Sequence, residues 1–133
     1  MLPTEIVVLA AAIVLLVVHI QIQAFAVTKE RGREWNMGAR DGQEPPLGPL
    51  AGRAQRALDN YKETWPALIA LALALAATGR TGGVGAAGAW IWLAARIVYL
   101  PLYLTGVKGW RTFAYVVSMA GLTMMLVRLF TGG

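Results

Sequence analysis

The chain contains a run of 23 residues without a single charged side chain, from Ile6 to Thr28 (IVVLAAAIVLLVVHIQIQAFAVT). A helix needs ~20 residues to cross the hydrocarbon core of a bilayer, so this run predicts a membrane-spanning helix. The whole chain of 133 residues is 57% hydrophobic and only 14% charged, a balance too apolar for a soluble domain of this size. We therefore expect an all-α integral membrane protein.

Three further segments predict helices of spanning length. Together with the first run, the expected helices are at about residues 3–28, 54–78, 84–105 and 109–130. The second helix has to include charged residues near Arg56, because the uncharged stretch 64–78 alone is too short to cross. Glycine-rich turns, GRTGGVG and GVKGW, separate the last three helices. The prediction is a single membrane domain, residues 1–133, built as a four-transmembrane-helix bundle.

The long loop at residues 29–53 mixes charged residues with Pro and Gly and has no clear helical or strand period, so we expect it outside the hydrocarbon. Basic residues favour the cytoplasmic side of membrane proteins. One predicted side has seven basic residues in this loop and around the GVKGW turn, whereas the other side has only Arg80 and Arg128; the seven are Lys29, Arg31, Arg33, Arg40, Arg53, Lys108 and Arg111. The charge pattern predicts a cytoplasmic loop and both termini outside.

Polar side chains recur at helical spacing on the last three predicted helices. The stripes comprise Arg56, Asp59, Asn60 and Glu63 on the second helix, Arg96, Tyr99 and Tyr103 on the third, and Arg111 and Tyr115 on the fourth. Counted at ~1.5 Å per residue from the cytoplasmic ends, the three groups reach similar depths in the cytoplasmic half of the bilayer. Arginines, acids, an amide and phenols at one level suit a small ligand that has carboxylates and an ammonium group.

The same residues also have a purely structural interpretation. Asp59 or Glu63 would pair with Arg56 or Arg96 simply to hold helices together. We favour a ligand site, because ionisable residues inside a membrane are costly and usually mark function. His19 is expected to be an interhelical hydrogen-bonding group or an interface residue rather than a ligand contact. Without cysteine and with one histidine the chain predicts no metal site, and any reactive thiol must come from a ligand.

The sequence RALDNYKETWP at residues 56–66 resembles the second-helix motif of the MAPEG family, the membrane-associated proteins of eicosanoid and glutathione metabolism. That motif reads approximately R-A-x-x-N-x-x-E-x-x-P. ARIVYLPLYL is similar to the family's third helix at its arginine and tyrosine, and GWRTFAYV to the fourth-helix motif R-[ST]-x-x-Y. The resemblance covers the second to fourth helices by motif and the first by length and position.

The resemblance implies a homotrimer of four-helix protomers that binds glutathione between neighbouring subunits near the cytoplasmic face. It implies that this co-substrate is held by Arg56, Asn60, Glu63, Arg96, Tyr99, Tyr103 and Tyr115. Glu63 would pair with the ammonium group, and the arginines with the carboxylates. The catalytic residues implied are Arg111, whose guanidinium would lower the pKa of the nearby thiol, and Thr112, which stands where some members have a serine implicated in thiolate formation.

The reaction type stays open, because conjugation, hydroperoxide reduction and isomerisation all begin from the same bound thiolate. A lipophilic electrophile or hydroperoxide would arrive from the lipid, through an apolar groove between the first and fourth helices. The partners implied are further copies of the chain, membrane lipid and this substrate, without nucleic acid. The loop resembles the bacterial branch of the family, which implies a bacterial inner membrane and leaves a thiol other than glutathione open.

Two other functions compete with a glutathione-dependent transferase or peroxidase. A non-catalytic membrane scaffold or regulator would keep the fold and use the polar stripes only to join helices. A small transporter or channel subunit fits least well, because ALIALALALAA and MAGLTMMLV leave the other half of the bilayer without a hydrophilic path.

Overall fold

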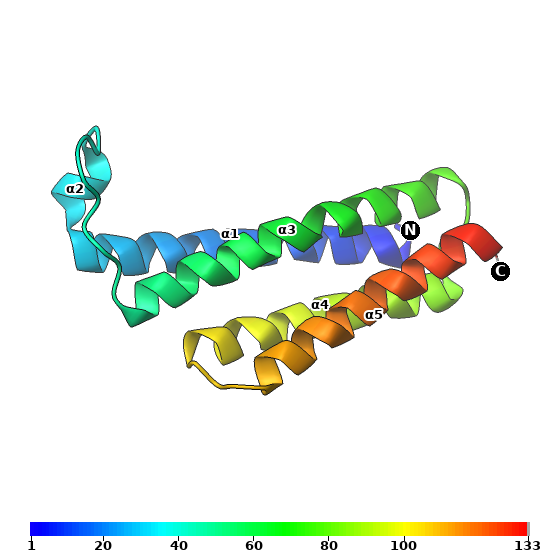
Figure 1. Cartoon of the computed structure of the whole chain (residues 1–133). Coiled ribbons are helices and arrows are strands. Elements are labelled where there is room, and N and C mark those ends of the chain that lie inside the picture. The colour runs from blue at the N-terminus through cyan, green and yellow to red at the C-terminus, as the bar shows by residue number, and fades with distance from the viewer. Residues whose placement is uncertain (133) are drawn as a thin grey trace.

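The computed structural model describes residues 1–132, and within them every regular element is a helix. α1 (Thr4–Arg31) and α3 (Pro49–Ala77) form one antiparallel pair, and α4 (Gly83–Leu104) and α5 (Trp110–Thr131) form another (Figure 1). A short helix that the sequence did not predict, α2 (Arg33–Met37), interrupts the loop between α1 and α3. The described chain therefore has four long helices and one short one.

The bounds of two helices differ from those expected. α1 continues three residues beyond Thr28, because Lys, Glu and Arg favour helix, and it stops at Gly32, whose φ of 90° suits glycine. α3 begins at Pro49 rather than near residue 54, because proline is well tolerated in the first helical turn. The bounds of α4 and α5 each differ from expectation by a single residue, which is within the ordinary uncertainty of helix ends.

The helices run up and down the length of the bundle. Both termini and the α3–α4 turn lie at one end, whereas the α1–α3 loop and the α4–α5 turn lie at the other (Figure 1). Three helices, α1, α4 and α5, are long and apolar enough to cross a membrane. The charged first half of α3 makes this helix less apolar, yet its 29 residues span about 43 Å, longer than a hydrocarbon core of about 30 Å.

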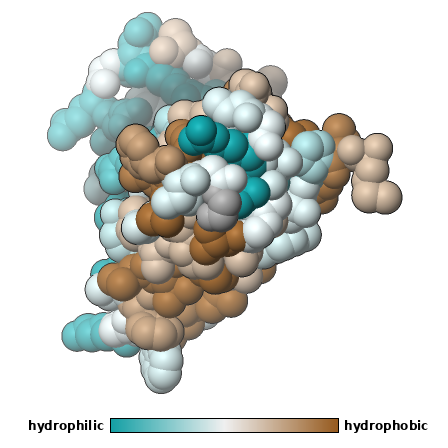
Figure 2. Space-filling view, turned by 90° about the vertical axis from the view of Figure 1, so that its right-hand side faces the viewer, coloured by the Kyte–Doolittle hydropathy of each residue, from teal (hydrophilic) through white to brown (hydrophobic). Residues whose placement is uncertain are grey.

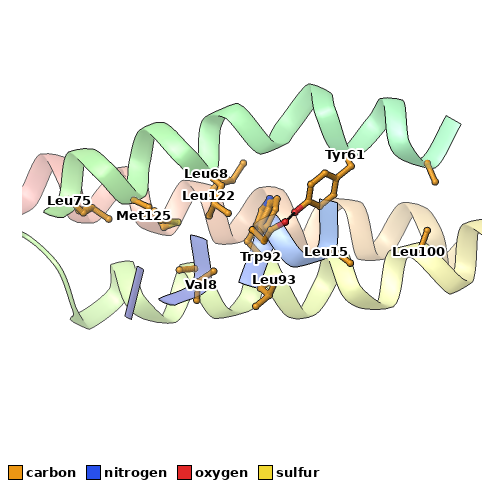
Figure 3. Packing of buried hydrophobic residues seen from close by; sticks show 14 residues of the cluster. Val8, Leu15, Tyr61, Leu68, Leu75, Trp92, Leu93, Leu100, Leu122 and Met125 are labelled. Carbon is orange, nitrogen blue, oxygen red and sulfur yellow. Dashed lines mark hydrogen bonds between the residues drawn. The ribbon is translucent and has the colours of Figure 1, made fainter. Parts of the chain in front are cut away.

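The core is an apolar column that all four long helices share. Figure 3 shows side chains from each of them, including Val8 on α1, Leu68 on α3, Trp92 on α4 and Met125 on α5, all of them fully buried. Tyr61 is the one hydroxyl-bearing ring in this column, and its Oη donates a 2.6 Å hydrogen bond to the backbone oxygen of Ala12. This bond joins α3 to α1 in a region where water is excluded.

Two glycines let α4 and α5 approach each other closely. A Cβ atom on Gly121 would lie 2.5 Å from the backbone oxygen of Gly88, and one on Gly88 would lie 2.5 Å from the backbone oxygen of Gly121. Real Cβ atoms essentially never approach other atoms so closely. Small residues at a crossing are how membrane helices bring their backbones into contact. The two glycines therefore fix the spacing of the hairpin that carries half of the polar residues discussed below.

Hydrogen bonds close the end of the bundle that carries both termini. Glu5 on α1 is fully buried, and its Oε1 accepts a 2.7 Å hydrogen bond from the backbone N–H of Gly82 in the α3–α4 turn. Arg128 on α5 donates to the backbone oxygens of Arg80 and Thr81, and Arg80 donates to that of Leu129. Figure 2 looks onto this end and shows a small hydrophilic group surrounded by pale and hydrophobic surface.

Candidate functional site

A polar pocket of about 400 Å³ lies between α3, α4 and α5, at the end of the bundle opposite the termini. Its lining consists of Arg56, Asp59, Asn60, Glu63, Tyr99, Tyr103, Arg111, Thr112 and Tyr115. Eight of the nine residues that the sequence analysis named as site residues are in this lining. Arg96 is the ninth and lies behind it. Asp59 lines the pocket too, although only its place in the polar stripe, and no motif position, pointed to it.

The α3 side of the pocket is one helical face. Its four lining residues follow the i, i+3, i+4, i+7 pattern, which brings them to the same side of the helix. Arg56, Asp59 and Glu63 are exposed in the single chain, and Asn60 is partly buried. Because this face belongs to a helix that packs along the membrane-spanning helix α1, its charges need a partner other than lipid.

The opposite side of the pocket is a chain of aromatic and cationic groups from α4 and α5. The rings of Tyr99 and Tyr103 meet edge to face with centroids 5.5 Å apart. The guanidinium carbon of Arg111 lies 4.5 Å from the centroid of the Tyr103 ring, within the range of a cation–π interaction. Thr112 and Tyr115 place two hydroxyl groups on the same helix as Arg111. The pocket therefore presents donors and a cation from this side.

Charges of both signs line the pocket without neutralising one another. Within residues 1–132, the ion pairs are Arg31–Glu44 at 3.7 Å and Lys62–Asp59 at 4.0 Å. Asp59 also accepts a 3.0 Å hydrogen bond from the side-chain amide of Gln55. In this part of the chain no acidic side chain pairs with the guanidinium groups of the site, and no basic one pairs with Glu63. The pairs that a purely structural interpretation expected are therefore not present.

Arg96 is placed differently from the other predicted site residues. Its side chain is completely buried, its Nη1 donates a 2.8 Å hydrogen bond to Oδ1 of Asn60, and its Nε and Nη2 have no partner. The guanidinium carbon lies 4.3 Å from the centroid of the Tyr99 ring and 5.4 Å from that of Tyr61. Arg96 thus contacts two residues of the pocket lining from behind.

The expected interhelical hydrogen bond of His19 is absent. The His19 ring is buried against that of Tyr61, with centroids 4.7 Å apart, and neither ring nitrogen has a hydrogen-bond partner. Tyr61 itself was missed by the sequence analysis, because it falls outside the polar stripe of α3. One sequence signal could have identified Tyr61, because it is an aromatic residue within a charged segment and Trp65 follows four positions later. The rings of Tyr61 and Trp65 stack.

Apolar grooves lie on either side of α5, and neither involves α1. One of about 390 Å³ runs between α3 and α5, and one of about 300 Å³ between α4 and α5. Within residues 1–132 of a single chain no groove lies between the first and fourth long helices, because α1 does not pack against α5. The α3–α5 groove includes Ala67 and Met119, each one helical turn beyond a residue of the polar pocket, Glu63 and Tyr115.

The arrangement suits recognition of a polar, zwitterionic molecule beside an apolar one. Guanidinium groups bind carboxylates, a carboxylate binds an ammonium group, and the hydroxyl groups complete a hydrogen-bonding shell. In the part of the chain that the structure describes, no group of three or more His, Cys, Asp or Glu side chains is arranged to hold a metal ion. The donors and acceptors of the lining thus match the groups of a zwitterionic organic molecule.

Comparison with known proteins gives one match. A model of the MAPEG family matches residues 6–131, which include nearly all of the four long helices. No curated protein and no solved structure matches the chain. Together with the apolar helices α1, α4 and α5, the match identifies an integral membrane protein. The chain belongs to the MAPEG family, the membrane proteins related to eicosanoid and glutathione metabolism.

Proposed function

We propose that this protein is a glutathione-dependent membrane enzyme of the transferase or peroxidase type. The observation that carries the proposal is the pocket whose guanidinium groups and carboxylate Glu63 have no ion-pair partner in the described chain. Glutathione has two carboxylates, one ammonium group and one thiol, and the donor set of the pocket fits each of them. A set of charges that served only to join helices would be paired across those helices.

Each lining residue has a role that follows from its chemistry. Arg56 binds a carboxylate of the ligand, and Glu63 binds its ammonium group. Asn60, Tyr99, Tyr103 and Tyr115 supply hydrogen bonds to the peptide. Arg111 and Thr112 face the thiol, and the guanidinium of Arg111 is held in place by the Tyr103 ring.

Glutathione, when bound, supplies the nucleophilic thiol that the chain itself lacks. Arg111 favours the thiolate over the thiol, because a cation nearby stabilises the charged form. Thr112 donates its hydroxyl hydrogen to the sulfur, which adds to this stabilisation. The α3–α5 groove continues from the polar pocket along the same helix faces, and it accommodates a lipophilic electrophile or hydroperoxide that arrives from the bilayer.

The exposed charges on α3 also support assembly. Arg56, Asp59 and Glu63 are exposed in the single chain on a helix that runs through the bundle, so we propose that a second copy covers this face in a homotrimer. The basic loops at the pocket end favour the cytoplasmic side. We accordingly propose a bacterial inner-membrane protein in which all four long helices cross, with both termini outside and the pocket on the cytoplasmic side.

The first test is a thermal-shift titration of the detergent-solubilised protein with reduced glutathione, its S-hexyl conjugate and an unrelated anionic tripeptide. A ligand that binds only the folded state raises the melting temperature. A saturable rise with the two glutathione forms, and none with the control tripeptide, supports the proposal. If millimolar glutathione produces no rise, glutathione is not the ligand.

A further inference from the structure

Arg96 is a buried cation without a buried anion. No carboxylate within residues 1–132 pairs with it, its side chain has no exposure, and two of its three nitrogens lack a hydrogen-bond partner. Burial of an uncompensated charge lowers stability, because the charge loses its hydration. Cation–π contacts with the rings of Tyr61 and Tyr99 recover part of this loss. A residue placed at such a cost to stability is expected to serve function.

The single hydrogen bond of Arg96 fixes the orientation of Asn60. A guanidinium group has donors and no acceptor, so only the oxygen of the Asn60 side chain can face it. The bond from Nη1 to Oδ1 measures 2.8 Å and comes from behind the pocket lining. The Nδ2 of Asn60, a residue of the pocket lining, is therefore a donor that does not bond Arg96.

The second contact of Arg96 supports the α4 wall of the pocket. Its guanidinium lies against the Tyr99 ring at 4.3 Å, Tyr99 meets Tyr103 at 5.5 Å, and Tyr103 lies against Arg111 at 4.5 Å. These four side chains form a continuous series of cation–π and edge-to-face contacts. Arg96 thus reaches Asn60 directly and Arg111 through two rings.

We infer that Arg96 is a positioning residue, which turns the Asn60 amide so that it donates to a ligand acceptor and holds the Tyr99 ring in the pocket wall. This role rests on the proposed function of the pocket and replaces direct contact between Arg96 and glutathione. This role predicts different effects of one substitution on ligand affinity and on thermal stability. Removal of the charge weakens ligand binding while it leaves stability unchanged or raises it.

The decisive variant is Arg96→Met, which keeps much of the volume and removes the cation. We expect a melting temperature without ligand at or above that of wild type, and an affinity for S-hexylglutathione that is about tenfold lower, the loss typical of one hydrogen bond to a charged group. His19→Phe is the matched control, because His19 contacts Tyr61 but does not bond Asn60, and it should bind as wild type does. Unchanged affinity in Arg96→Met, or a loss of affinity accompanied by a lower melting temperature, overturns the inference.

A second variant tests the same point if Arg96→Met does not fold. Asn60→Asp keeps the partner of Arg96 but presents an oxygen instead of an amide to the pocket, so it should fold stably and bind S-hexylglutathione about tenfold more weakly. Affinity equal to that of wild type would show that no donor is needed there.

A ligand-free measurement separates this inference from the proposed function. The NMR order parameter of the Asn60 side-chain amide should be high in wild type and fall in Arg96→Lys, whose single ammonium cannot reproduce both contacts. If wild type binds no glutathione, the proposed function fails. The positioning role is overturned if the order parameter of the amide is equally low in wild type and in the variant.

Discussion

Several charged side chains of the pocket lining have no ion-pair partner in the described chain. Lys62 and Glu63 are adjacent in sequence and both exposed, yet Lys62 pairs with Asp59 whereas Glu63 lines the pocket without a cationic partner. Arg56 and Arg111 have no acidic partner in the described chain either. Because such charges are costly within a membrane, their shared position argues for a ligand that carries the complementary charges.

Glu63→Gln tests the ammonium partner. The change removes one charge and keeps the shape, so we expect affinity for reduced glutathione to fall about tenfold with little change in melting temperature. Isothermal titration of the purified protein measures the affinity. Lys62→Gln, which removes the neighbouring charge outside the pocket, should leave it unchanged. Equal losses in both variants would point to the overall charge of the helix instead.

Arg111→Ala tests thiolate stabilisation through the pH dependence of turnover. A cation beside the thiol lowers the pKa of that thiol, so we expect glutathione bound to the wild-type protein to form thiolate at lower pH than free glutathione does. Without the guanidinium the thiol pKa rises, and the pH–rate profile with a model electrophile should move to higher pH, with a lower rate at neutral pH. The ultraviolet absorbance of bound thiolate should fall in parallel. An unmoved profile would remove Arg111 from this role.

At the scale of elements, the α4–α5 hairpin carries one whole side of the pocket. Gly88 and Gly121 bring the two backbones into contact. Tyr99 and Tyr103 lie about three and four helical turns beyond Gly88 along α4, and Arg111 lies about three turns before Gly121 along α5, so the spacing at the crossing affects the pocket. The α4–α5 hairpin thus carries five of the nine residues that line the pocket.

Gly121→Ala tests this crossing. Its new Cβ would lie 2.5 Å from the Gly88 oxygen, so α4 and α5 must separate, at a cost of about 1–3 kcal/mol in stability. Thermal unfolding in detergent should show a lower melting temperature. Ala120→Val adds volume at the adjacent exposed position and should have little effect. If both variants melt as wild type does, the helices are not held by close contact at the glycines.

The sequence predicts these elements well because hydrophobic length and glycine turns are local signals. It places the ends of α1 and α3 less well, because good helix formers at residues 29–31 and a proline at the first position of α3 extend helices beyond their apolar runs. The depth of each polar residue follows from counting along a helix, and the polar residues of three helices do meet at one pocket. Counting does not give the rotation of α4 toward its neighbours, and this rotation buries Arg96 behind Asn60.

At the scale of the molecule, the polar side chains at the two ends of the bundle have different interactions. The end with the termini is closed by side-chain bonds from Glu5, Arg80 and Arg128 to backbone groups of other elements. The opposite end holds the polar pocket, and its charged groups there are available to a ligand. We therefore expect the bonds that close the end with the termini to contribute to stability independently of ligand binding at the other end.

Glu5→Ala should separate these two properties. It leaves the partly buried Gly82 N–H without its acceptor, which costs about 1 kcal/mol, so the melting temperature should fall. Affinity for S-hexylglutathione, measured below the melting transition, should not change. Glu44→Ala removes an exposed loop carboxylate and serves as the control. A loss of affinity in Glu5→Ala would show that the two ends are coupled.

The charged first half of α3 also has a consequence for biosynthesis. Each Asp, Lys or Arg at the centre of a helix opposes entry into the bilayer from the translocon by ~2.5 to 3.5 kcal/mol, so α3 is a poor candidate to insert alone. α1 is uncharged from Ile6 to Thr28 and receives the Tyr61 hydrogen bond at Ala12. We therefore expect the two helices to enter as a hairpin. In a translocation assay, a fragment with α3 alone should stay outside the membrane, and one with α1 and α3 should integrate.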